Sequence, residues 1–476
     1  MPRTISAHNP RTGEEDYEFA VSTREEIAAE AEKLRAAQPA WEAMGPEGRA
    51  AVMMRFADAL EAAAPAIAAA LAIDTGRQTV AWLEVNGCVG NIRGWAAKAP
   101  ALFASLPSEV EPSFTPGVEI VPAYSAYPLF GAICPWNFPV ILSHIDAVPA
   151  LMAGCAALVK PSEITPRFVE PMREVLAQVP ELPLAYIMGG PEVGQALIEE
   201  VDYICFTGST ATGRKVAEAA ARQLIPANLE LGGKDPMIIT ASADPEWAAG
   251  VALRSSIVAT GQACQSIERI YVAREIADAF LAKLVEGAEA VELTYPDPAQ
   301  GHLGPFIFPP QGAKVQAHID EAKGKGARVL TGGLIEELGG GTYLRPTILT
   351  DVTPDMAVMR EETFGPVLPV TVFDDIEDAI AQANDTEYGL SAAVLAASLE
   401  EAASIGARLD AGAISLQDGA MTSMVGDAAN ESRKSSGLGP SRMGNTGLLR
   451  FLRRQSLIRQ TGQALTIDAY AEGARG

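Results

Sequence analysis

One cysteine has neighbours that suit a reactive thiol. Cys264 lies in the segment ATGQACQSIER, residues 259–269, among small and polar side chains and five positions before an arginine. A cysteine thiolate is a strong nucleophile that forms covalent intermediates with carbonyl compounds. The alternative is a small apolar residue that fills a core, which is a common role for cysteine.

Two further segments carry side chains that could assist such a nucleophile. Glu230 lies in the apolar segment NLELGGKDP, residues 228–236, where a carboxylate is costly to bury unless it is neutral or paired, and a buried carboxylate suits a general base. Asn137 lies in CPWNFP, residues 134–139, where a rigidly held amide could donate to a developing oxyanion. A half-exposed strand residue and an ordinary turn asparagine remain the alternatives.

Two other segments suit a nucleotide. FTGSTATGRKVAEAA, residues 206–220, places Gly208 and Ser209 between an apolar strand and a helix, where free N–H groups could bind a pyrophosphate, although the segment is not the GxGxxG fingerprint. LVKPSEITP ends an apolar strand with Lys160 and Glu163, which could bind a ribose or phosphate over the sheet edge. An ordinary strand-to-helix turn and a surface charge pair are the alternatives.

The elements that must position these segments follow from the periodicity. Residues 23–100 have the alanine-rich, 3.6-residue pattern of helices, and residues 109–136 have the β-branched and aromatic character of strands. Strand and helix patterns then alternate from residue 128 to about 240, and again after residue 269. Strands separated by helices pair in parallel through right-handed crossovers. The sequence therefore predicts two doubly wound α/β domains in a chain of 476 residues.

Charge and composition exclude several classes of function. With 36 basic and 60 acidic residues the net charge is −24, which repels nucleic acid and anionic lipid. The five cysteines form neither a disulfide framework nor a zinc spacing, and the four histidines form no ligand motif, so no metal site is predicted. The sequence also lacks a GxSxG nucleophile elbow, which disfavours a hydrolase.

Nothing in the chain indicates a membrane segment or a leader. Residues 1–19 lack the apolar core of a signal peptide. The longest apolar run, residues 140–159, contains His144, Asp146 and Pro149, which favour a buried helix over a membrane span. We therefore expect a cytoplasmic protein without a membrane partner.

Six motifs, in this order along more than 230 residues, resemble those of one family. They are PWNFP, KPSE, FTGST, LELGGK, GQACQSIER and EETFGPV. Together they are similar to the NAD(P)-dependent aldehyde dehydrogenase superfamily, and the resemblance extends from the N-terminal helices to about residue 465. It implies an aldehyde-dehydrogenase-like α/β fold and an oxidation that uses a nicotinamide cofactor.

By this resemblance, Cys264 would attack the aldehyde carbonyl to give a thiohemiacetal. The side chain of Asn137 and the backbone N–H of Cys264 would hold the oxyanion. After hydride passes to the nicotinamide, Glu230 would activate the water that hydrolyses the resulting thioester, and it would also help to deprotonate the thiol. Covalent catalysis of this kind separates oxidation from hydrolysis, so each half needs its own helper.

The resemblance also assigns seven residues to the cofactor. Lys160 and Glu163 would bind the adenosine ribose, and Glu163 would repel a 2′-phosphate, which favours NAD while leaving NADP possible. The full set is Trp136, Lys160, Glu163, Gly208, Ser209, Glu362 and Phe364, with Ser209 at the pyrophosphate and the last two at the nicotinamide ribose and ring.

The family fold implies three parts in this chain. Residues 1–106 and 128–231 would form the cofactor-binding domain, and residues 232–440 the catalytic domain. A small β oligomerisation element would combine residues 107–127 with 450–470 and pair across subunits. We therefore expect a homodimer or homotetramer.

Two positions depart from the family pattern. Ala259 occupies a position where the family commonly has asparagine, two residues before the Gly-Gln pair. Residues 429–447, ANESRKSSGLGPSRMGNTG, replace the usual PFGGxKxSGxGRE run and keep only the spacing of Lys434, Gly437 and Gly439. That segment borders the substrate entrance in the family, so the usual substrates do not transfer to this chain.

The substrate and the acyl acceptor leave alternatives open. Ala263, Gln265 and Phe138, which we expect beside the substrate tunnel, allow a medium-chain or aromatic aldehyde. A CoA-acylating enzyme, an NADP-preferring semialdehyde dehydrogenase and a catalytically silent binding member are the other interpretations. The presence of Glu230 favours hydrolysis over transfer to coenzyme A, and the presence of Cys264 and Asn137 as well disfavours a silent member.

Overall fold

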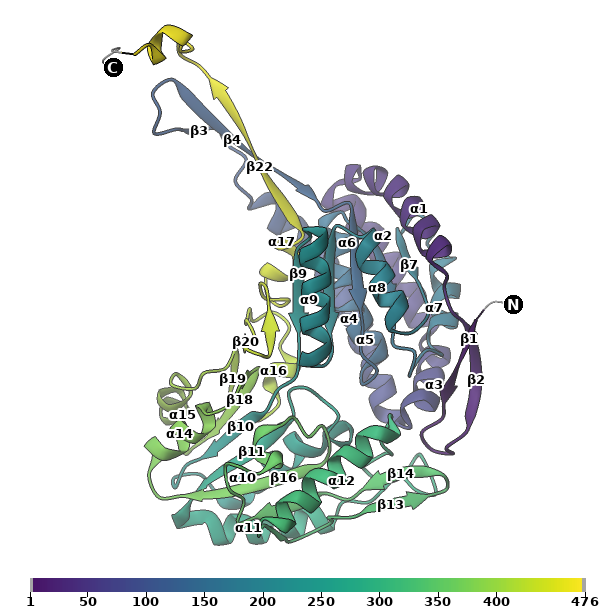
Figure 1. Ribbon diagram of the computed structural model, residues 1–476, viewed down its shortest axis with the longest axis vertical. Coiled ribbons are helices and arrows are strands. Elements are labelled where there is room, and N and C mark those ends of the chain that lie inside the picture. The colour runs from purple at the N-terminus through teal and green to yellow at the C-terminus, as the bar shows by residue number, and fades with distance from the viewer. Residues whose placement is uncertain (1–2, 473–476) are drawn as a thin grey trace.

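Two twisted sheets, each covered by helices on both faces, make up most of residues 3–472, which the computed structural model describes (Figure 1). The first sheet has the order β21-β9-β8-β5-β6-β7, and only its β21–β9 pair is antiparallel. Its strands are β5 (Leu129–Ile133), β6 (Ala156–Lys160), β7 (Leu184–Tyr186), β8 (Tyr203–Thr207), β9 (Ala227–Glu230) and β21 (Gly437–Leu438).

Helices cover both faces of this sheet because its strands are apolar on both sides. All five residues of β6 and of β8 are buried, as in a parallel sheet between helical layers. One face packs on α1 (Arg24–Ala43), α8 (Pro191–Glu200) and α9 (Thr210–Gln223). The other packs on α2 (Gly45–Ala62), α3 (Ala64–Thr75), α4 (Gln78–Ala104), α5 (Pro139–His144), α6 (Ala147–Ala153) and α7 (Val169–Leu176).

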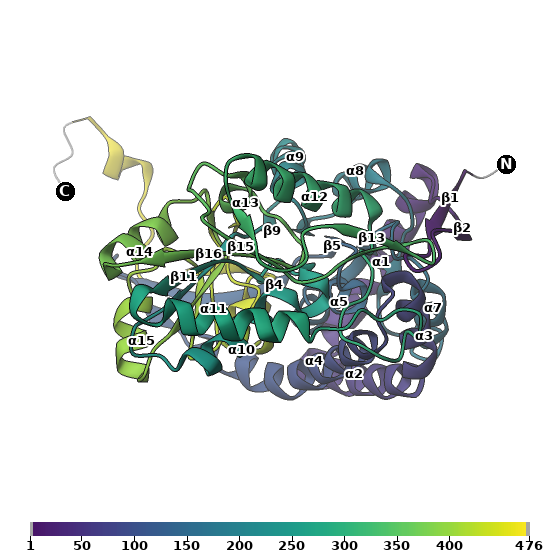
Figure 2. The same cartoon turned by 90° about the horizontal axis from the view of Figure 1, so that it is seen from below.

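The second sheet has seven strands in the order β12-β15-β16-β11-β10-β18-β19, parallel except at the β12 edge. The strands are β10 (Asp235–Ile239), β11 (Ile267–Ala273), β12 (Arg328–Val329), β15 (Thr347–Thr350), β16 (Val367–Phe373), β18 (Ser391–Leu395) and β19 (Ala413–Leu416). Figure 2 shows helices on both of its sides. They are α10 (Pro245–Ile257) and α11 (Arg274–Glu289) on one, with α12 (Pro309–Gly324), α13 (Ala357–Arg360), α14 (Ile376–Asn384) and α15 (Leu399–Gly406) on the other.

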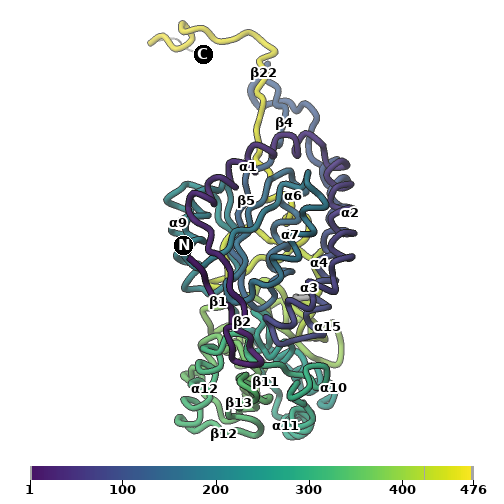
Figure 3. The backbone as a smooth tube through the Cα atoms, turned by 90° about the vertical axis from the view of Figure 1, so that its right-hand side faces the viewer, coloured from purple at the N-terminus to yellow at the C-terminus, as the bar shows by residue number. Residues whose placement is uncertain are grey.

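A narrow three-stranded sheet projects from the body as an arm (Figures 1 and 3). It pairs β22 (Leu452–Gln460) with β4 (Val118–Ala126) over nine residues, and β4 with β3 (Glu111–Pro112). The remaining short elements are β1 (Thr4–His8), β2 (Glu15–Ala20), β13 (Ile335–Leu338), β14 (Gly341–Leu344), β17 (Tyr388–Gly389), β20 (Arg433–Lys434), α16 (Met421–Met424), α17 (Thr446–Leu449) and the 3₁₀ turns Val258–Gly261 and Ile467–Tyr470.

The predicted fold class of two doubly wound α/β units with an additional β element is confirmed. The expected buried helix in residues 140–159 is present as two short helices, α5 and α6, and the end of that run forms the start of β6. Pro149 is tolerated in α6 because it lies in the first turn, whose N–H groups have no partner within the helix.

Among residues 3–472, no single helix has the length and apolar character needed to cross a membrane. The bent pair α2 and α3, at 64°, meets the length and composition criteria only when the two helices are taken together.

Replacing Phe451 with alanine should destabilise the protein strongly. Phe451 is fully buried, and its ring packs edge-to-face on Phe130 and Tyr203, at centroid distances of 5.1 and 5.0 Å. The cavity should lower the free energy of unfolding by about 3–5 kcal/mol, measured by urea denaturation followed by circular dichroism. Leu334→Ala, at a side chain that is 64% exposed, is the control and should change it by less than about 0.5 kcal/mol. Equal effects from both variants would contradict this packing.

Candidate active site

The sequence motifs meet where two sheet edges face each other. In the first sheet the motifs follow the carboxyl ends of β5, β6, β8 and β9, which all lie at one edge because these strands are parallel. In the second sheet the motifs immediately precede the amino ends of the neighbouring strands β10, β11 and β16. The strand order of the first sheet reverses between β5 and β8, since the chain runs outward from β5 through β6 and β7 and then returns to β8 on the other side. Open α/β sheets bind ligands at this switch point.

Close backbone contacts join three of the motifs. A Cβ atom at Gly233 would lie 2.6 Å from the carbonyl oxygen of Cys264, and one at Gly232 would lie 2.8 Å from Oε2 of Glu362. The contact at Gly233 is with the backbone and leaves no room for a side chain, so glycine is required there, whereas the neighbour of Gly232 is the end of the flexible Glu362 side chain. The segments that contain Glu230, Cys264 and Glu362 therefore converge on one site.

Cys264 follows a turn with an unusual backbone. Ala259, Thr260 and Gly261 are left-handed in succession, with φ of 56°, 62° and 66°. This conformation is costly for alanine and threonine, whereas asparagine tolerates it better. The departure at Ala259 therefore carries a conformational cost that surrounding contacts must offset. One such contact is the hydrogen bond that the Thr260 hydroxyl donates to the carbonyl of Gly304, at 3.1 Å.

Arg77, which sequence reasoning missed, connects this turn to the asparagine loop. Its buried guanidinium donates to the carbonyls of Ala259, at 3.3 Å, and Asn137. The Asn137 amide in turn donates to the carbonyl of Gln262, at 3.0 Å, and its second N–H is the group that could face a substrate oxyanion. In the sequence, Arg77 is marked only by its position after Gly76 and directly before a helix.

Without cofactor or substrate, the thiol of Cys264 is protonated at neutral pH. Burial raises its pKa to about 12, and the negative charges of Glu362, Asp235 and Glu230 add to the effect. Arg269, the arginine nearest in sequence, does not reach the thiol. It donates instead to the carbonyls of Lys234 and Ala383, at 2.9 and 2.8 Å.

Glu230 is held by residues from the segment that departs from the family pattern. The Ser432 hydroxyl donates to Oε2 of Glu230, at 2.7 Å. The guanidinium Nε of Arg442 lies 3.9 Å from Oε1. Gly437 pairs with Glu230 in the β21–β9 ladder, which brings this distant segment to the site. Neither Ser432 nor Arg442 carried a recognisable signal in the sequence.

The loop that carries Glu362 and Phe364 is fixed by a buried carboxylate. Glu268 accepts from the backbone N–H groups of Thr363 and Phe364, at 2.8 and 2.7 Å, and pairs with Lys234 at 2.6 Å. Phe364 is left-handed, with φ of 57°, so these bonds hold a strained backbone. Glu362 accepts from the Gly233 N–H, and burial, with the charge of Glu268, raises its pKa to about 7.

The residues predicted to bind a dinucleotide line the same edge. Lys160 ends β6 and pairs with Glu163 at 3.1 Å. Ser209 caps α9 directly after Gly208, so the first turn of that helix presents free N–H groups. The rings of Trp136 and Phe364 lie edge-to-face, with centroids 5.5 Å apart. A cation, a carboxylate, helix N–H groups and an aromatic surface fit a nicotinamide dinucleotide.

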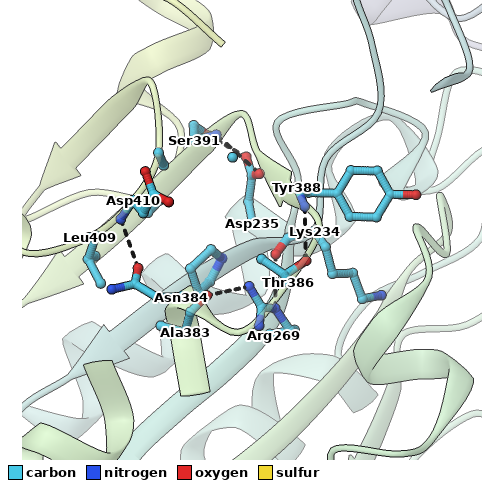
Figure 4. A pocket seen from close by; sticks show the side chains of 14 residues that line it. Lys234, Asp235, Arg269, Ala383, Asn384, Thr386, Tyr388, Ser391, Leu409 and Asp410 are labelled. Atoms are coloured by element: carbon cyan, nitrogen blue, oxygen red, sulfur yellow. Dashed lines mark hydrogen bonds between the residues drawn. The ribbon is translucent and has the colours of Figure 1, made fainter. Parts of the chain in front are cut away.

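Figure 4 shows a polar cavity behind this site, with a volume of about 10 Å³. Asp235 faces Ser391, which donates to it through both its hydroxyl and its N–H, and burial raises the pKa of Asp235 well above its ordinary value. A volume this small holds about one water molecule. The cavity is therefore too small for a substrate, and its lining residues hold the Lys234–Asp235 segment in place.

The rate of alkylation of Cys264 should keep rising at pH values where the rate for an ordinary thiol has already levelled off. With a pKa of about 12 the thiolate fraction grows about tenfold per pH unit between pH 7 and 10, because the thiolate is the reactive form. The rate of inactivation by iodoacetamide, measured without cofactor, should follow this rise. Cys264→Ala is the control, since the other four cysteines are buried. A plateau below pH 8 would contradict the raised pKa.

Comparison with known proteins places this geometry in one family. Residues 1–457 match the profile of the "Aldehyde dehydrogenase family". A protein of Mycolicibacterium smegmatis named "Putative succinate-semialdehyde dehydrogenase", with NADP(+) as the stated cofactor, is 39% identical over 462 residues, which cover 96% of this chain and 88% of that protein.

Solved structures agree in fold. Aldehyde dehydrogenase PutA of Anabaena variabilis, itself described as putative, is 45% identical, with a TM-score of 0.94 over 98% of this chain and 99% of that one. Betaine aldehyde dehydrogenase of Staphylococcus aureus, solved in complex with NAD+, is 28% identical, with a TM-score of 0.88 over 98% and 93% of the two chains. The chain described here therefore belongs to the aldehyde dehydrogenase family of oxidoreductases.

Proposed function

We propose that this chain oxidises a small-molecule aldehyde to the carboxylic acid through a thioester on Cys264, which Glu230 then helps to hydrolyse. The observation that carries the proposal is the convergence of three groups from separate strand ends. They are the Cys264 thiol, the Asn137 amide, which donates to the Gln262 carbonyl, and the Glu230 carboxylate, which accepts from Ser432.

The first half of the reaction forms a bond between the Cys264 sulfur and the carbonyl carbon. The thiol proton leaves to Glu230, and the carbonyl electrons move to oxygen, giving an oxyanion. The free N–H of Asn137 and the backbone N–H of Cys264 donate to that oxygen, which lowers the barrier because the donors are already in place. A bound nicotinamide dinucleotide supplies a hydride acceptor, and oxidation leaves a thioester on Cys264.

The second half releases the acid. Glu230 first releases to solvent the proton that it took from the thiol. It then takes a proton from water as the water oxygen attacks the thioester carbon, and the carbon–sulfur bond breaks. Asn137 serves the second oxyanion as it served the first. The Cys264 thiolate regains a proton, so the enzyme returns to its starting form.

Seven residues would hold the cofactor: Trp136, Lys160, Glu163, Gly208, Ser209, Glu362 and Phe364. NAD is favoured, because the Glu163 carboxylate beside Lys160 accepts from ribose hydroxyls and repels a 2′-phosphate. The Staphylococcus aureus structure with NAD+ supports this choice, whereas the name of the Mycolicibacterium protein supports NADP as the second possibility.

The chain divides into a cofactor-binding domain, a catalytic domain and an oligomerisation element. Residues 1–106 and 128–231 form the cofactor-binding domain and residues 232–440 the catalytic domain, with β21 returning from the latter range to pair with β9. Residues 107–127 and 450–470 form the oligomerisation element. All five cysteines are free thiols, which supports the reducing environment of the cytoplasm.

The substrate is an aldehyde of medium size or with an aromatic group, which suits Ala263, Gln265 and Phe138. A semialdehyde is the second candidate, supported by the name of the Mycolicibacterium protein. Transfer of the acyl group to coenzyme A is disfavoured, since Glu230 is present and hydrogen-bonded by Ser432.

The proposal is tested by measuring NADH formation from NAD with a panel of aldehydes. Wild-type protein should form NADH with at least one of a set of aliphatic, aromatic and semialdehyde substrates, measured by absorbance, and Cys264→Ala should be inactive. Glu230→Gln should lower kcat by about a hundredfold, because it removes the base that activates water. Turnover that survives in Cys264→Ala would exclude the mechanism, and turnover that requires added coenzyme A would exclude hydrolysis.

The arm should mediate self-association. It exposes large apolar side chains along and beyond β22, which are costly to leave in water: Leu457, Ile458, Leu465, Ile467 and Tyr470. Wild-type protein should sediment at two or four times its chain mass of 50.0 kDa, and Ile458→Glu at a smaller multiple. Leu399→Glu, an exposed leucine away from the arm, should sediment as wild type. A monomeric wild-type protein would overturn the proposal.

A further inference from the structure

A cluster of buried charges lies directly behind Glu230. Asp146, between α5 and α6, accepts from the guanidinium groups of Arg442, at 2.7 Å, and Arg450. Arg442 also donates to the Thr207 hydroxyl, at 2.6 Å. Asp146, Arg442 and Arg450 are all buried, so each charge depends on the others for its stability.

The charges of this cluster do not balance by themselves. Burial alone would disfavour the charged forms, but the two arginines lower the pKa of Asp146, and Asp146 with Glu230 raises the pKa of Arg442. All three residues are therefore ionised, which leaves one net positive charge in a buried position. The Glu230 carboxylate faces this charge, with its Oε1 at 3.9 Å from the Nε of Arg442.

One polar atom of Arg442 has no partner. Its Nε is buried and makes no hydrogen bond within residues 3–472, although a buried N–H without an acceptor is costly. This is the atom that faces Oε1 of Glu230. The other oxygen, Oε2, accepts from Ser432. A small movement of the Glu230 carboxylate would give Arg442 Nε its missing acceptor while the Ser432 bond is kept.

We infer that Arg442 is a positioning residue for hydrolysis: anchored by Asp146 and Thr207, it holds the Glu230 carboxylate in the orientation that activates water. The inference rests on the proposed role of Glu230. Ser432 and Arg442 both come from residues 429–447, so the segment that departs from the family pattern supplies the support for the general base.

Arg450 provides a matched control within the same cluster. It shares Asp146 with Arg442, and the structure gives it no contact with Glu230. Arg442→Lys and Arg450→Lys each weaken the buried cluster, but only the first removes an N–H that faces Glu230. A lysine at 442 keeps the positive charge and cannot serve Asp146, Thr207 and Glu230 together.

Hydrolysis of p-nitrophenyl acetate without any cofactor tests the inference, since it needs only the thiol and the base. Protein quenched during turnover is analysed by intact mass spectrometry for the acetylated fraction of Cys264. Arg442→Lys should lower the steady-state rate by about tenfold, and Arg442→Met further, while the acetylated fraction rises toward one. Ser432→Ala should act in the same direction. Arg450→Lys should stay within about twofold of wild type.

A double-mutant comparison separates positioning from structural damage. If Arg442 acts through Glu230, Arg442→Lys should change the rate by less than about twofold in a Glu230→Gln background. A full tenfold loss in that background, a fall in the acetylated fraction, or an equal loss in Arg450→Lys would overturn the inference. Acetylation that persists in Cys264→Ala would instead refute the proposed function itself, so the two failures are distinguishable.

Discussion

The site depends on backbone segments that approach more closely than any side chain allows. Gly233 lies against the carbonyl of Cys264, and Gly261 lies against the backbone of Gly365, so three loops from two sheets pack main chain on main chain. This contact sets the distance between the thiol, the carboxylate and the Glu362 loop. The left-handed backbone at residues 259–261 follows from it, because the turn must bring Gly261 to Gly365 and still point Cys264 into the site.

Around this contact the protein buries charged side chains against polar or charged partners. Lys234 with Glu268 fixes the strained Phe364 loop, and Arg77 spans the carbonyls of Ala259 and Asn137. Each buried ion is expensive unless its partner is in place, so these groups tolerate only one arrangement of the loops. The loops that carry the candidate catalytic side chains are therefore positioned by residues outside the candidate set.

Residues 429–447 show how a departure from a family pattern can be misjudged. From the sequence, the loss of the PFGG portion concerned only the substrate entrance. In the structure the same segment forms β21, pairs with β9, and delivers Ser432 and Arg442 to Glu230. In the proposed mechanism the segment thus bears on hydrolysis of the acyl intermediate, and the charge of its Arg442 is matched by Asp146 in another part of the chain.

The sequence by itself determined the fold class and the identity of Cys264, Glu230 and Asn137 as candidates, because helix and strand periodicity and short motifs are local properties. Only the tertiary structure revealed Arg77 and Arg442, which act on groups 60 and more residues away. It also divided the apolar run 140–159 at Asp146, where a carboxylate must meet two arginines about 300 residues later. Hydrophobic patterning selects which face of an element is buried, but it carries no information on which distant charge will neutralise a buried one. That pairing arises only when the chain is folded.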